Sequence, residues 1–412
     1  MMPTDDRPGR QTILGLPRTV FILGVVSLLT DASSEMIYPL LPLFLATTLG
    51  AGPAFIGLIE GVAESTASLL KLFSGWWSDR LGRRKAIVVG GYALSACVRP
   101  LVALAGTGWH VLAIRFTDRV GKGLRTAPRD ALIAAAAPSE SWGKAFGFHR
   151  AMDHAGAVIG PLIAFALLST VVHDLRTVFA LAAIPGLLAV AVLIARVADA
   201  PPAPRAAAGP PRLSLAPFSP RFRAVLAVIT LFTLGNSSDA FLLLKAHDVG
   251  VGAASIPLLW IVLHLSKALS STPAGALSDR IGRPRLILAG WLVYAGVYGG
   301  FAVADHAWQI WVLFVVYGFF FGLTEGVEKA YIADLAPPDL RGTAYGLYHA
   351  AVGLTALPAS LLMGLVWEHV SPAAAFTVGA ALALASAVLF LLVLGSPASR
   401  KEMPLTSAAR FR

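Results

Sequence analysis

Cysteine and charged residues are both scarce in this sequence. Its 412 residues include one cysteine, Cys97, so no disulfide framework can stabilise the fold. Charged residues make up 14% of the chain, whereas soluble domains carry about a quarter. The apolar share is 56% and the mean hydropathy is +0.72. This composition excludes an ordinary soluble domain and predicts a protein that crosses a membrane several times.

Motifs for soluble chemistry are also missing. The chain has no G-x-x-x-x-G-K-[ST] loop to cradle phosphates, which argues against a pump driven by ATP. It has no cluster of Cys and His with the spacing of metal ligands, and no nucleophile with a matching base stands out. We therefore expect no enzymatic activity, no metal and no cofactor.

The apolar residues gather in long runs. A helix needs about 20 such residues to cross a bilayer, and the chain supplies roughly twelve runs of this kind. They are continuous Ala, Leu, Val and Gly stretches rather than the short alternating segments of a membrane β-barrel. The expected fold is an all-α polytopic membrane protein with twelve transmembrane helices.

Lysine and arginine are distributed unevenly between the expected loops. One alternating set of loops holds nearly all of them, and the opposite set holds only Arg176. By the positive-inside rule, both termini and the central segment lie in the cytoplasm, and we expect the protein in the inner membrane. This asymmetry accounts for the net charge of +10, so no nucleic-acid partner is needed to explain it.

The two halves of the chain repeat each other. SDRLGRRK at 78–85 returns as SDRIGRPR at 278–285, APSESWGKAFG at 137–147 as APPDLRGTAYG at 336–346, and SSE at 33–35 as SSD at 237–239. A stretch dense in Pro and Ala separates the halves and suits a semi-rigid linker. We expect a cytoplasmic N-terminal segment, a six-helix bundle, a cytoplasmic linker, a second six-helix bundle and a cytoplasmic tail, with the bounds 1–17, 18–197, 198–220, 221–396 and 397–412.

The repeated octets resemble a motif of a known transporter family. GWWSDRLGRRK and GALSDRIGRPR are similar to the G-x-x-x-D-R-x-G-R-[RK] loop of the major facilitator superfamily. The resemblance extends to span count, loop polarity, linker and repeat, and it implies two six-helix bundles related by pseudo-twofold symmetry. It also implies that the loop is a cytoplasmic latch, in which glycine permits the tight turn; in a simpler view the loop only fixes topology. The latch residues are Gly75, Asp79, Arg80, Gly82, Arg83, Gly275, Asp279, Arg280, Gly282 and Arg283.

Two other stretches match family patterns only in part. Gly156, Gly160 and Pro161 fit the first part of the G-x-x-x-G-P-x-x-G-G signature of proton-driven exporters, without its closing glycines. This match favours export. In RFTDRVGKG of the expected fourth span, Asp118 and Arg119 stand where the family commonly has glutamine and glycine.

Ionisable residues inside the expected spans are the candidate functional residues. Each charge costs about 3 kcal/mol to insert, so it normally pairs or lines a wet cavity. The candidates for proton coupling are Asp31, Glu35 and Asp239. The candidates for the substrate cavity are Glu64, Arg115, Arg119, His154, His264 and Lys267. Four residues that swap charge sign between the repeats are expected to form the ion pairs of a cytoplasmic gate, namely Arg129, Asp130, Glu328 and Lys329.

Two alternatives stay open for these charges. Asp31 and Glu35 either carry protons or simply neutralise Arg115 and Arg119. The two arginines either bind an anionic or zwitterionic solute, which we favour, or are satisfied by acids and leave room for a lipophilic cation.

The sequence thus predicts a monomeric secondary transporter that moves a small organic solute through the lipid bilayer by alternating access. We expect proton coupling, and export by antiport in preference to uptake. The alternatives are a proton-coupled uptake symporter for an organic anion and a non-transporting receptor or scaffold on the same fold.

Overall fold

The computed structural model describes residues 12–81, 84–138, 142–172, 174–197, 214–337 and 340–395. These residues are overwhelmingly helical, and two short strands, β1 (Thr12–Ile13) and β2 (Leu16–Pro17), pair antiparallel ahead of the first long helix. The expected all-α architecture is therefore confirmed. Most of the expected N-terminal segment and linker, the whole tail, and the latch residues Gly82 and Arg83 lie outside the described residues.

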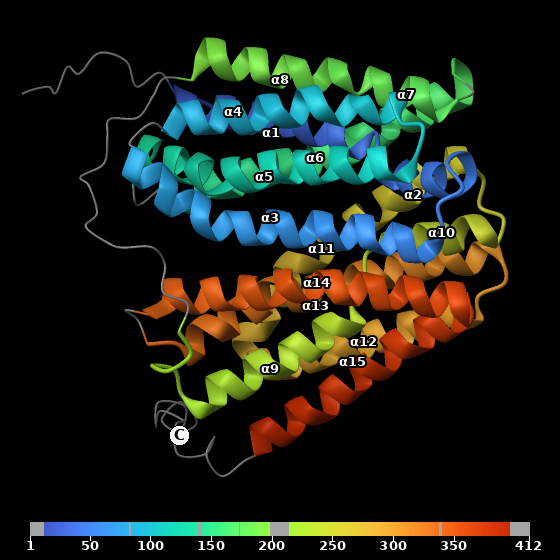
Figure 1. Ribbon diagram of the computed structural model, residues 1–412. Helices are drawn as coiled ribbons and strands as arrows, with labels where there is room; N and C mark the ends of the chain where they lie inside the picture. The colour runs from blue at the N-terminus through green and yellow to red at the C-terminus, as the bar shows by residue number, and fades with distance from the viewer. Residues whose placement is uncertain are drawn as a thin grey trace, which may run out of the picture. The chain divides into compact units, whose positions relative to one another are not determined.

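Long helices run through both halves of the chain (Figure 1). The first half forms α1 (Arg18–Glu35), α3 (Pro53–Leu81), α4 (Arg84–Val98), α5 (Gly108–Ala136), α6 (Trp142–Thr170), α7 (Leu175–Leu181) and α8 (Ala183–Arg196). The second half forms α9 (Pro220–Gly235), α10 (Ala240–Asp248), α11 (Ile256–Ile281), α12 (Arg283–Val303), α13 (Ala307–Leu335), α14 (Arg341–His369) and α15 (Pro372–Gly395). Short helical turns extend or precede several of them: η1 (Tyr38–Leu40), α2 (Leu41–Leu43), η2 (Phe44–Thr48), η3 (Arg99–Leu104) and η5 (Ala253–Ser255).

Ten segments of the described chain are long and apolar enough to cross a membrane. α3 and α5 are each 29 residues long but are not among the ten. Acidic and basic side chains lower the hydropathy of both, including Glu60 and Glu64 in α3 and the charged row between Arg115 and Asp130 in α5. The twelve expected spans are thus ten apolar segments and two charged helices of spanning length.

The first span of each half is broken at the repeated Ser-Ser-acid sequence. α1 ends at Glu35, and Pro39 and Pro42 follow within η1 and α2. Proline lacks an N–H and clashes with the preceding turn of a helix, so these two residues explain why α1 does not continue. α9 ends at Gly235, and α10 begins only after Asp239. A carboxylate therefore lies at the break of each first span.

Polar side chains start several helices by accepting a hydrogen bond from a backbone N–H. Thr107 accepts from His110 at the start of α5, and Ser219 accepts from Phe222 at the start of α9. Asp174 accepts from the N–H of Thr177 at 2.8 Å at the start of α7. The hydrogen bonds from Thr177 hold the pKa of Asp174 below its usual value.

The helices pack into two compact units that do not follow the sequence halves strictly. The first unit consists of Met1–Ala51, Thr66–Pro211 and Val251–His264. The second unit consists of Gly52–Ser65, Arg212–Gly250 and Leu265–Arg412. The continuous helices α3 and α11 each pass from one unit into the other.

Close helix contacts in the first unit depend on small residues. α1 packs against α6 and α8, and α4 packs against α5 and α8 (Figure 1). A Cβ added at Gly156 of α6 would lie 2.5 Å from the carbonyl oxygen of Leu28, and one at Gly160 would overlap the carbonyl oxygen of Ala32. The exporter-like glycines therefore let α6 approach α1 at the turn that carries Asp31.

Aromatic rings fill the second unit, in which α12 packs against α13 and α15, and α9 packs against α14 and α15. Trp291, Tyr294 and Tyr298 of α12 are fully buried. The rings of Phe232 and Trp291 stack with centroids 4.7 Å apart, and those of Tyr294 and Tyr298 with centroids 4.1 Å apart. The first stack joins α9 to α12, the second lies within α12, and both contribute to the core of this unit.

The first turns of α3 lie against α14 within the second unit. A Cβ at Gly57 would overlap the carbonyl oxygen of Ser360, and one at Gly61 would lie 2.8 Å from the Cα atom of Leu357. Ser65 Oγ donates to a carbonyl oxygen of α14 at 2.6 Å. In the first unit, η5 packs correspondingly against α6.

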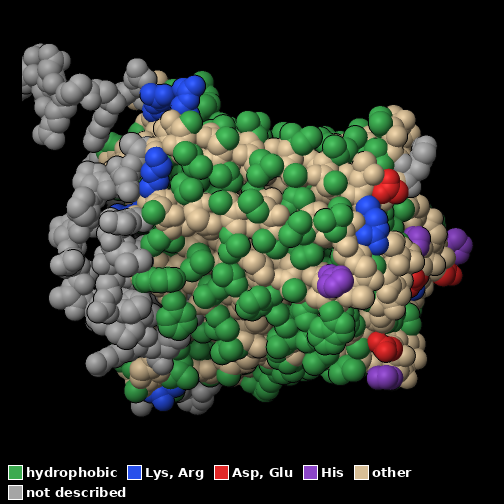
Figure 2. Space-filling view, turned by 45° about the horizontal axis from the view of Figure 1, so that its top comes forward, with side chains coloured by type: hydrophobic (Ala, Val, Ile, Leu, Met, Phe, Trp, Pro, Cys, Tyr) green, Lys and Arg blue, Asp and Glu red, His purple; other side chains and the backbone are tan. Residues whose placement is uncertain are grey.

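The surface suits a lipid environment. Figure 2 shows hydrophobic side chains over the middle of one face and charged side chains toward its two ends. Large apolar residues such as Leu162, Leu292 and Leu392 are 45%, 48% and 65% exposed on the long helices. Exposed apolar area on this scale is normal where hydrocarbon rather than water surrounds the helices.

We predict that Gly156→Ala destabilises the protein and that Gly147→Ala does not. The methyl group at residue 156 meets backbone and side-chain atoms of α1, and such overpacking costs about 1–3 kcal/mol. Nothing lies within 4 Å of a Cβ at residue 147 of the same helix, so alanine there gains about 1 kcal/mol from helix propensity. Thermal unfolding of the two purified variants measures both effects. Equal melting temperatures would contradict the close approach of α6 to α1.

Candidate functional site

A polar cavity of about 210 Å³ lies inside the first unit. Five helices contribute to it: α1, α3, α4, α5 and α6. Its lining residues are Ser27, Thr30, Asp31, Lys71, Tyr92, Lys122, Arg125, Thr126, Arg129, Arg150 and Asp153. Five of these side chains are cationic and two are carboxylates, so the cavity is basic.

The cations of the cavity come mainly from one face of α5. Lys122, Arg125 and Arg129 are three and four residues apart, a spacing that places side chains on the same side of a helix. Arg125 is buried, its guanidinium carbon lies 4.3 Å from the ring centroid of Tyr92, and its Nη1 donates to Ser95 Oγ at 2.7 Å. Both partners belong to α4, so the orientation of Arg125 is set before any solute binds.

The carboxylates of the cavity come from α1 and α6. Asp31 lies in the last turns of α1, before its break. Asp153 accepts a short hydrogen bond from Ser27 Oγ, which joins α6 to α1. Its oxygens also lie 3.6 Å from Nδ1 of His149 and 3.8 Å from Nη1 of Arg150. A proton or an anion that enters the cavity therefore meets two carboxylates and five cationic side chains.

Glu35, Arg115 and Arg119 are not among the residues that line this cavity. Glu35 Oε2 accepts from Nε1 of Trp260 at 2.7 Å. The guanidinium carbon of Arg115 lies 5.3 Å from the ring centroid of Tyr38, and Nε of Arg119 lies 3.5 Å from Oδ2 of Asp118. The acid beside Arg119 is thus Asp118, the preceding residue of α5, and the indole of Trp260 donates to Glu35.

The remaining cavity candidates are spread over both units. His154 lies in α6 of the first unit, half-buried, and His264 Nδ1 lies 2.9 Å from the carbonyl oxygen of Trp260. Glu64 lies in the part of α3 that belongs to the second unit. The Nζ atom of Lys267, also in the second unit, lies 3.6 Å from the ring centroid of Phe321. These four candidates are thus divided, with His154 and His264 in the first unit and Glu64 and Lys267 in the second.

Asp239 is bound by aromatic residues of the second unit. Its Oδ1 accepts from Tyr317 Oη at 2.7 Å, and Tyr298 Oη lies 3.3 Å from Ser237 Oγ, two residues earlier. Tyr294 Oη donates to the carbonyl oxygen of Gly235 at 2.8 Å. Three phenol groups therefore contact polar atoms at the break between α9 and α10.

The expected gate residues contact partners within their own units. Arg129 Nη2 lies 2.8 Å from Asp130 Oδ1 in α5, and Lys329 Nζ lies 3.7 Å from an oxygen of Glu325 in α13. Glu328 is buried and accepts from Trp291 Nε1 at 2.9 Å and from Tyr348 Oη at 3.1 Å. Ion pairing between the halves at this level stays a prediction.

The second latch sequence is described in part. Gly282 separates α11 from α12 with φ of +94°, a conformation that glycine adopts without strain. Arg283 Nη1 pairs with Asp334 at 2.5 Å and donates to the carbonyl oxygen of Ala330 at 2.6 Å, so it ties the start of α12 to the end of α13. Arg280 is exposed and Gly275 is half-buried within α11. The surroundings of Gly75 and the side chains of Asp79, Arg80 and Asp279 lie outside the described set.

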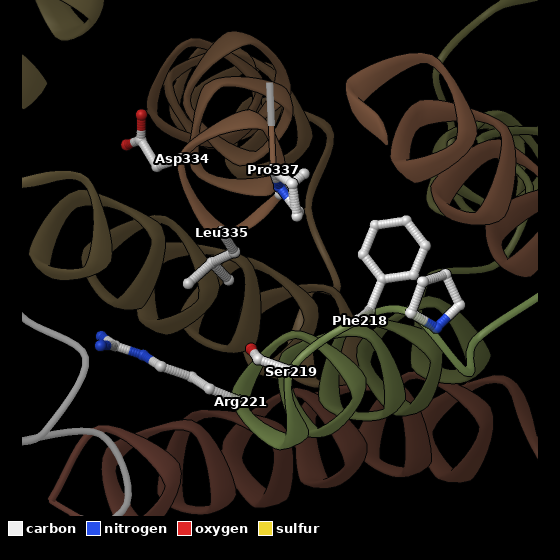
Figure 3. A pocket seen from close by; sticks show the side chains of 8 residues that line it. Phe218, Ser219, Arg221, Asp334, Leu335 and Pro337 are labelled. Carbon is white, nitrogen blue, oxygen red and sulfur yellow. The ribbon is translucent and has the colours of Figure 1, made fainter. Parts of the chain in front are cut away.

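A second cavity, of about 470 Å³, lies between the start of α9 and the end of α13 (Figure 3). It is lined by Pro217, Phe218, Ser219, Arg221, Asp334, Leu335, Ala336 and Pro337. Arg221 donates to Tyr331 at 3.2 Å, and Asp334 pairs with Arg283. Its charged groups already make structural contacts, and we assign it no function. Among the described residues, no group of three or more His, Cys, Asp or Glu side chains is arranged to hold a metal ion.

Sequence reasoning missed Arg99 and Asp153. Arg99 lies in the apolar run SACVRPLVAL, where a lone charge is a usable signal. Its Nη2 pairs with Oδ1 of Asp118 at 2.9 Å, and both side chains are buried. Asp153 is the neighbour of His154 and follows His149 by one helical turn, a spacing that could have singled it out.

Known proteins similar to this chain are membrane transporters. The family model described as Major Facilitator Superfamily matches residues 23–263 and 224–410. An uncharacterized MFS-type transporter of Methanocaldococcus jannaschii is 35% identical over 384 residues, which cover 92% of this chain and 95% of that protein. The fosmidomycin resistance protein of Escherichia coli is 28% identical over 372 residues, or 86% of this chain and 88% of that protein. The solved structure of the nucleoside transporter NupG has a TM-score of 0.76 at 13% identity and covers 91% of this chain and 99% of that one.

The basic cavity should favour anionic over cationic thiol reagents. In a Cys97→Ser background, we expect Thr126→Cys to react with sulfonatoethyl methanethiosulfonate faster than with its trimethylammonioethyl analogue, by on the order of tenfold after normalisation to a small thiol. Adding Lys122→Gln or Arg125→Gln should lower this ratio. Gly252→Cys, at an exposed position before η5, is the control and should show no preference. A ratio at Thr126→Cys equal to that at Gly252→Cys would contradict a basic cavity.

Proposed function

Because the chain belongs to the major facilitator superfamily, we propose that it is a secondary active transporter that moves a small organic solute by alternating access. The moving parts in this proposal are the two six-helix bundles, residues 18–197 and 221–396. The loop distribution of Lys and Arg supports a position in the inner membrane, with both termini in the cytoplasm. We propose that the transporter works as a monomer.

The basic cavity of the first unit carries the proposal for the solute. Its five cations outnumber its two carboxylates, so an anionic or zwitterionic group that enters the cavity meets more positive than negative side chains. Arginine also suits carboxylate and phosphate groups, because its N–H groups form a planar fork. A lipophilic cation would instead add a positive charge to this excess. We therefore propose an organic anion or zwitterion, bound mainly by Lys122 and Arg125.

Proton coupling is the second part of the proposal. Asp31 faces the cavity beside the bases of α5, while Glu35 and Asp239 lie at the breaks of the two first spans. Broken helices in transporters place polar groups where a solute or ion can reach them. We propose that Asp31 is the main proton carrier. We propose that Glu35 and Asp239 take part in the movement of the first span of each half at its break.

Export is the proposed direction. Gly156 and Gly160 place α6 against α1, as expected if the partial exporter signature has a structural role. One relative is named a resistance protein, which fits removal of a compound from the cell. Uptake together with protons is the alternative that the same basic cavity allows.

Proton movement in proteoliposomes tests this function. Vesicles that enclose a pH-sensitive dye are given organic anions, zwitterions, lipophilic cations or sugars, and a transported solute changes the dye signal. We expect anions or zwitterions to do so, and to stabilise the purified protein by about 2.7 kcal/mol at 100 times the dissociation constant.

Asp31→Asn separates binding from coupling. We expect it to reduce solute-driven proton movement at least about tenfold, because an amide neither gains nor loses a proton at these pH values, while stabilisation by the same solute persists. Asp305→Asn, in the loop before α13, is the matched control and should behave like the unmodified protein. Stabilisation without any solute or proton movement would instead identify a receptor, and stabilisation by lipophilic cations alone would refute the proposed solute class.

A further inference from the structure

A buried ion pair in the first unit has no role in the proposed function. Arg99 Nη2 contacts Asp118 Oδ1 at 2.9 Å, and the two side chains are 7% and 3% exposed. Arg99 begins η3 at the end of α4, and Asp118 lies in the middle of α5. Asp118 is also one of the two positions at which RFTDRVGKG departs from the pattern common in the family.

Arg99 uses its other terminal nitrogen to hold α1. Nη1 donates to the carbonyl oxygen of Thr30 at 3.2 Å and to Ser33 Oγ at 3.1 Å. Ser33 Oγ in turn donates at 2.7 Å to the carbonyl oxygen of Ala182, which joins α7 to α8. A cation at this end of α1 also faces the negative end of the helix dipole. One guanidinium thus connects four of the expected spans.

The held segment lies between the acids that the proposed function uses. Asp31 follows Thr30 directly and lines the cavity, and Glu35 is the last residue of α1. Because Thr30 and Ser33 are both fixed, the turn from residue 30 to residue 33 cannot rotate without breaking contacts to Arg99.

Asp118 connects the same pair to the basic face of α5. It precedes Lys122 by four residues and Arg125 by seven, so the three side chains lie along one side of the helix. Ser95 Oγ, which accepts from Arg125, donates to the carbonyl oxygen of Asp118 at 3.2 Å. The acid of α1 and the bases of α5 are therefore held in register through a single buried pair.

We propose that Arg99 and Asp118 form a positioning pair that directs Asp31 into the basic cavity. The pair touches neither solute nor transferred proton, and its role rests on the proposed function of Asp31 as proton carrier. The charged and titratable groups that share the cavity with Asp31 come from every helix around it. They are Lys71 from α3, Tyr92 from α4, Lys122, Arg125 and Arg129 from α5, and Arg150 and Asp153 from α6, with Glu35 beyond Asp31 on α1.

The role of the Arg99–Asp118 pair can be tested without a known solute. The measurement is the ratio of the rates at which the anionic and the cationic thiol reagent modify Thr126→Cys, as a function of pH. The ratio of anionic to cationic reagent rates cancels the ionisation of the thiol itself. In the Cys97→Ser background we expect the ratio to rise on the order of threefold or more from pH 8 to pH 5, because protonation removes a carboxylate that repels the anionic reagent. Asp31→Asn should abolish most of this rise.

Arg99→Met/Asp118→Leu is the decisive variant. It removes both charges of the pair at once, and replacing a buried ion pair with apolar groups of similar volume commonly preserves folding. It also removes the carboxylate that lies 3.5 Å from Nε of the buried Arg119. We therefore expect a lower melting temperature than that of the parent protein, together with loss of half or more of the pH-dependent rise or displacement of its midpoint by about 1 pH unit.

Arg176→Met is the matched control. Arg176 also holds a neighbouring segment, since it donates to the carbonyl oxygen of Ala103 at 2.7 Å and lies over the ring of Phe44, away from Asp31. It should leave the pH curve unchanged. If the double variant fails to fold, Arg99→Lys replaces it, because a single ammonium retains the charge but not the planar fork, and the same change in the pH curve is expected.

The outcomes separate the two proposals. An unchanged pH curve in a folded double variant, or in Arg99→Lys, overturns the positioning role while leaving the proton role of Asp31 intact. If the reagent selectivity of the parent protein does not depend on pH, and Asp31→Asn behaves identically, the proton role and the positioning role are both overturned. An altered curve in the pair variants but not in Arg176→Met supports the proposal.

Discussion

A guanidinium inside an apolar helix bundle is stable only where acceptors or aromatic faces meet it. The first unit meets this constraint at Arg99 and at Arg125. Arg99 meets a carboxylate, a carbonyl and a hydroxyl, while Arg125 meets a hydroxyl and the ring of Tyr92. Each contact joins different helices, so compensating the charges also fixes how α1, α4 and α5 pack. The polar cavity is the space that remains between groups that are already held.

The two halves repeat in sequence but compensate their buried polar groups differently. In the second unit, Asp239 and Glu328 accept hydrogen bonds from tyrosine and tryptophan rather than from arginine. Neutral aromatic donors stabilise a carboxylate without creating a cation of their own, and their rings also fill the core. The duplication therefore preserved the positions of the breaks, while the chemistry around them diverged. We assign solute binding to the first half for this reason.

Much of the fold can be predicted from the sequence, because helices of spanning length and the internal repeat are properties of the chain itself. The helical period also shows that the charges of α5 share a broad face. It does not show which neighbour that face meets, and here Lys122 and Arg125 line the cavity while Arg115 and Arg119 do not. The partner of Glu35 is Trp260, which is 225 residues away and could not be inferred from spacing.

Arg99 also shows what the sequence alone cannot predict. Its charge within an apolar run is visible in the sequence, but the pair with Asp118 depends on the register of two helices. Periodicity assigns residues to faces, whereas register decides which atoms meet.

The crossing of α3 into the second unit has a mechanical consequence. Its first turns meet α14 through glycines and backbone atoms, with one serine hydroxyl and Glu368, which accepts from the N–H of Ala54 at 3.0 Å. Small residues let the two helices pack closely, and few hydrogen bonds or ion pairs must break when such helices separate. α3 is an unbroken helix, so if it moves as a rigid rod with the rest of its bundle, this seam is what must part. A seam made of small residues can open and close many times at little energetic cost.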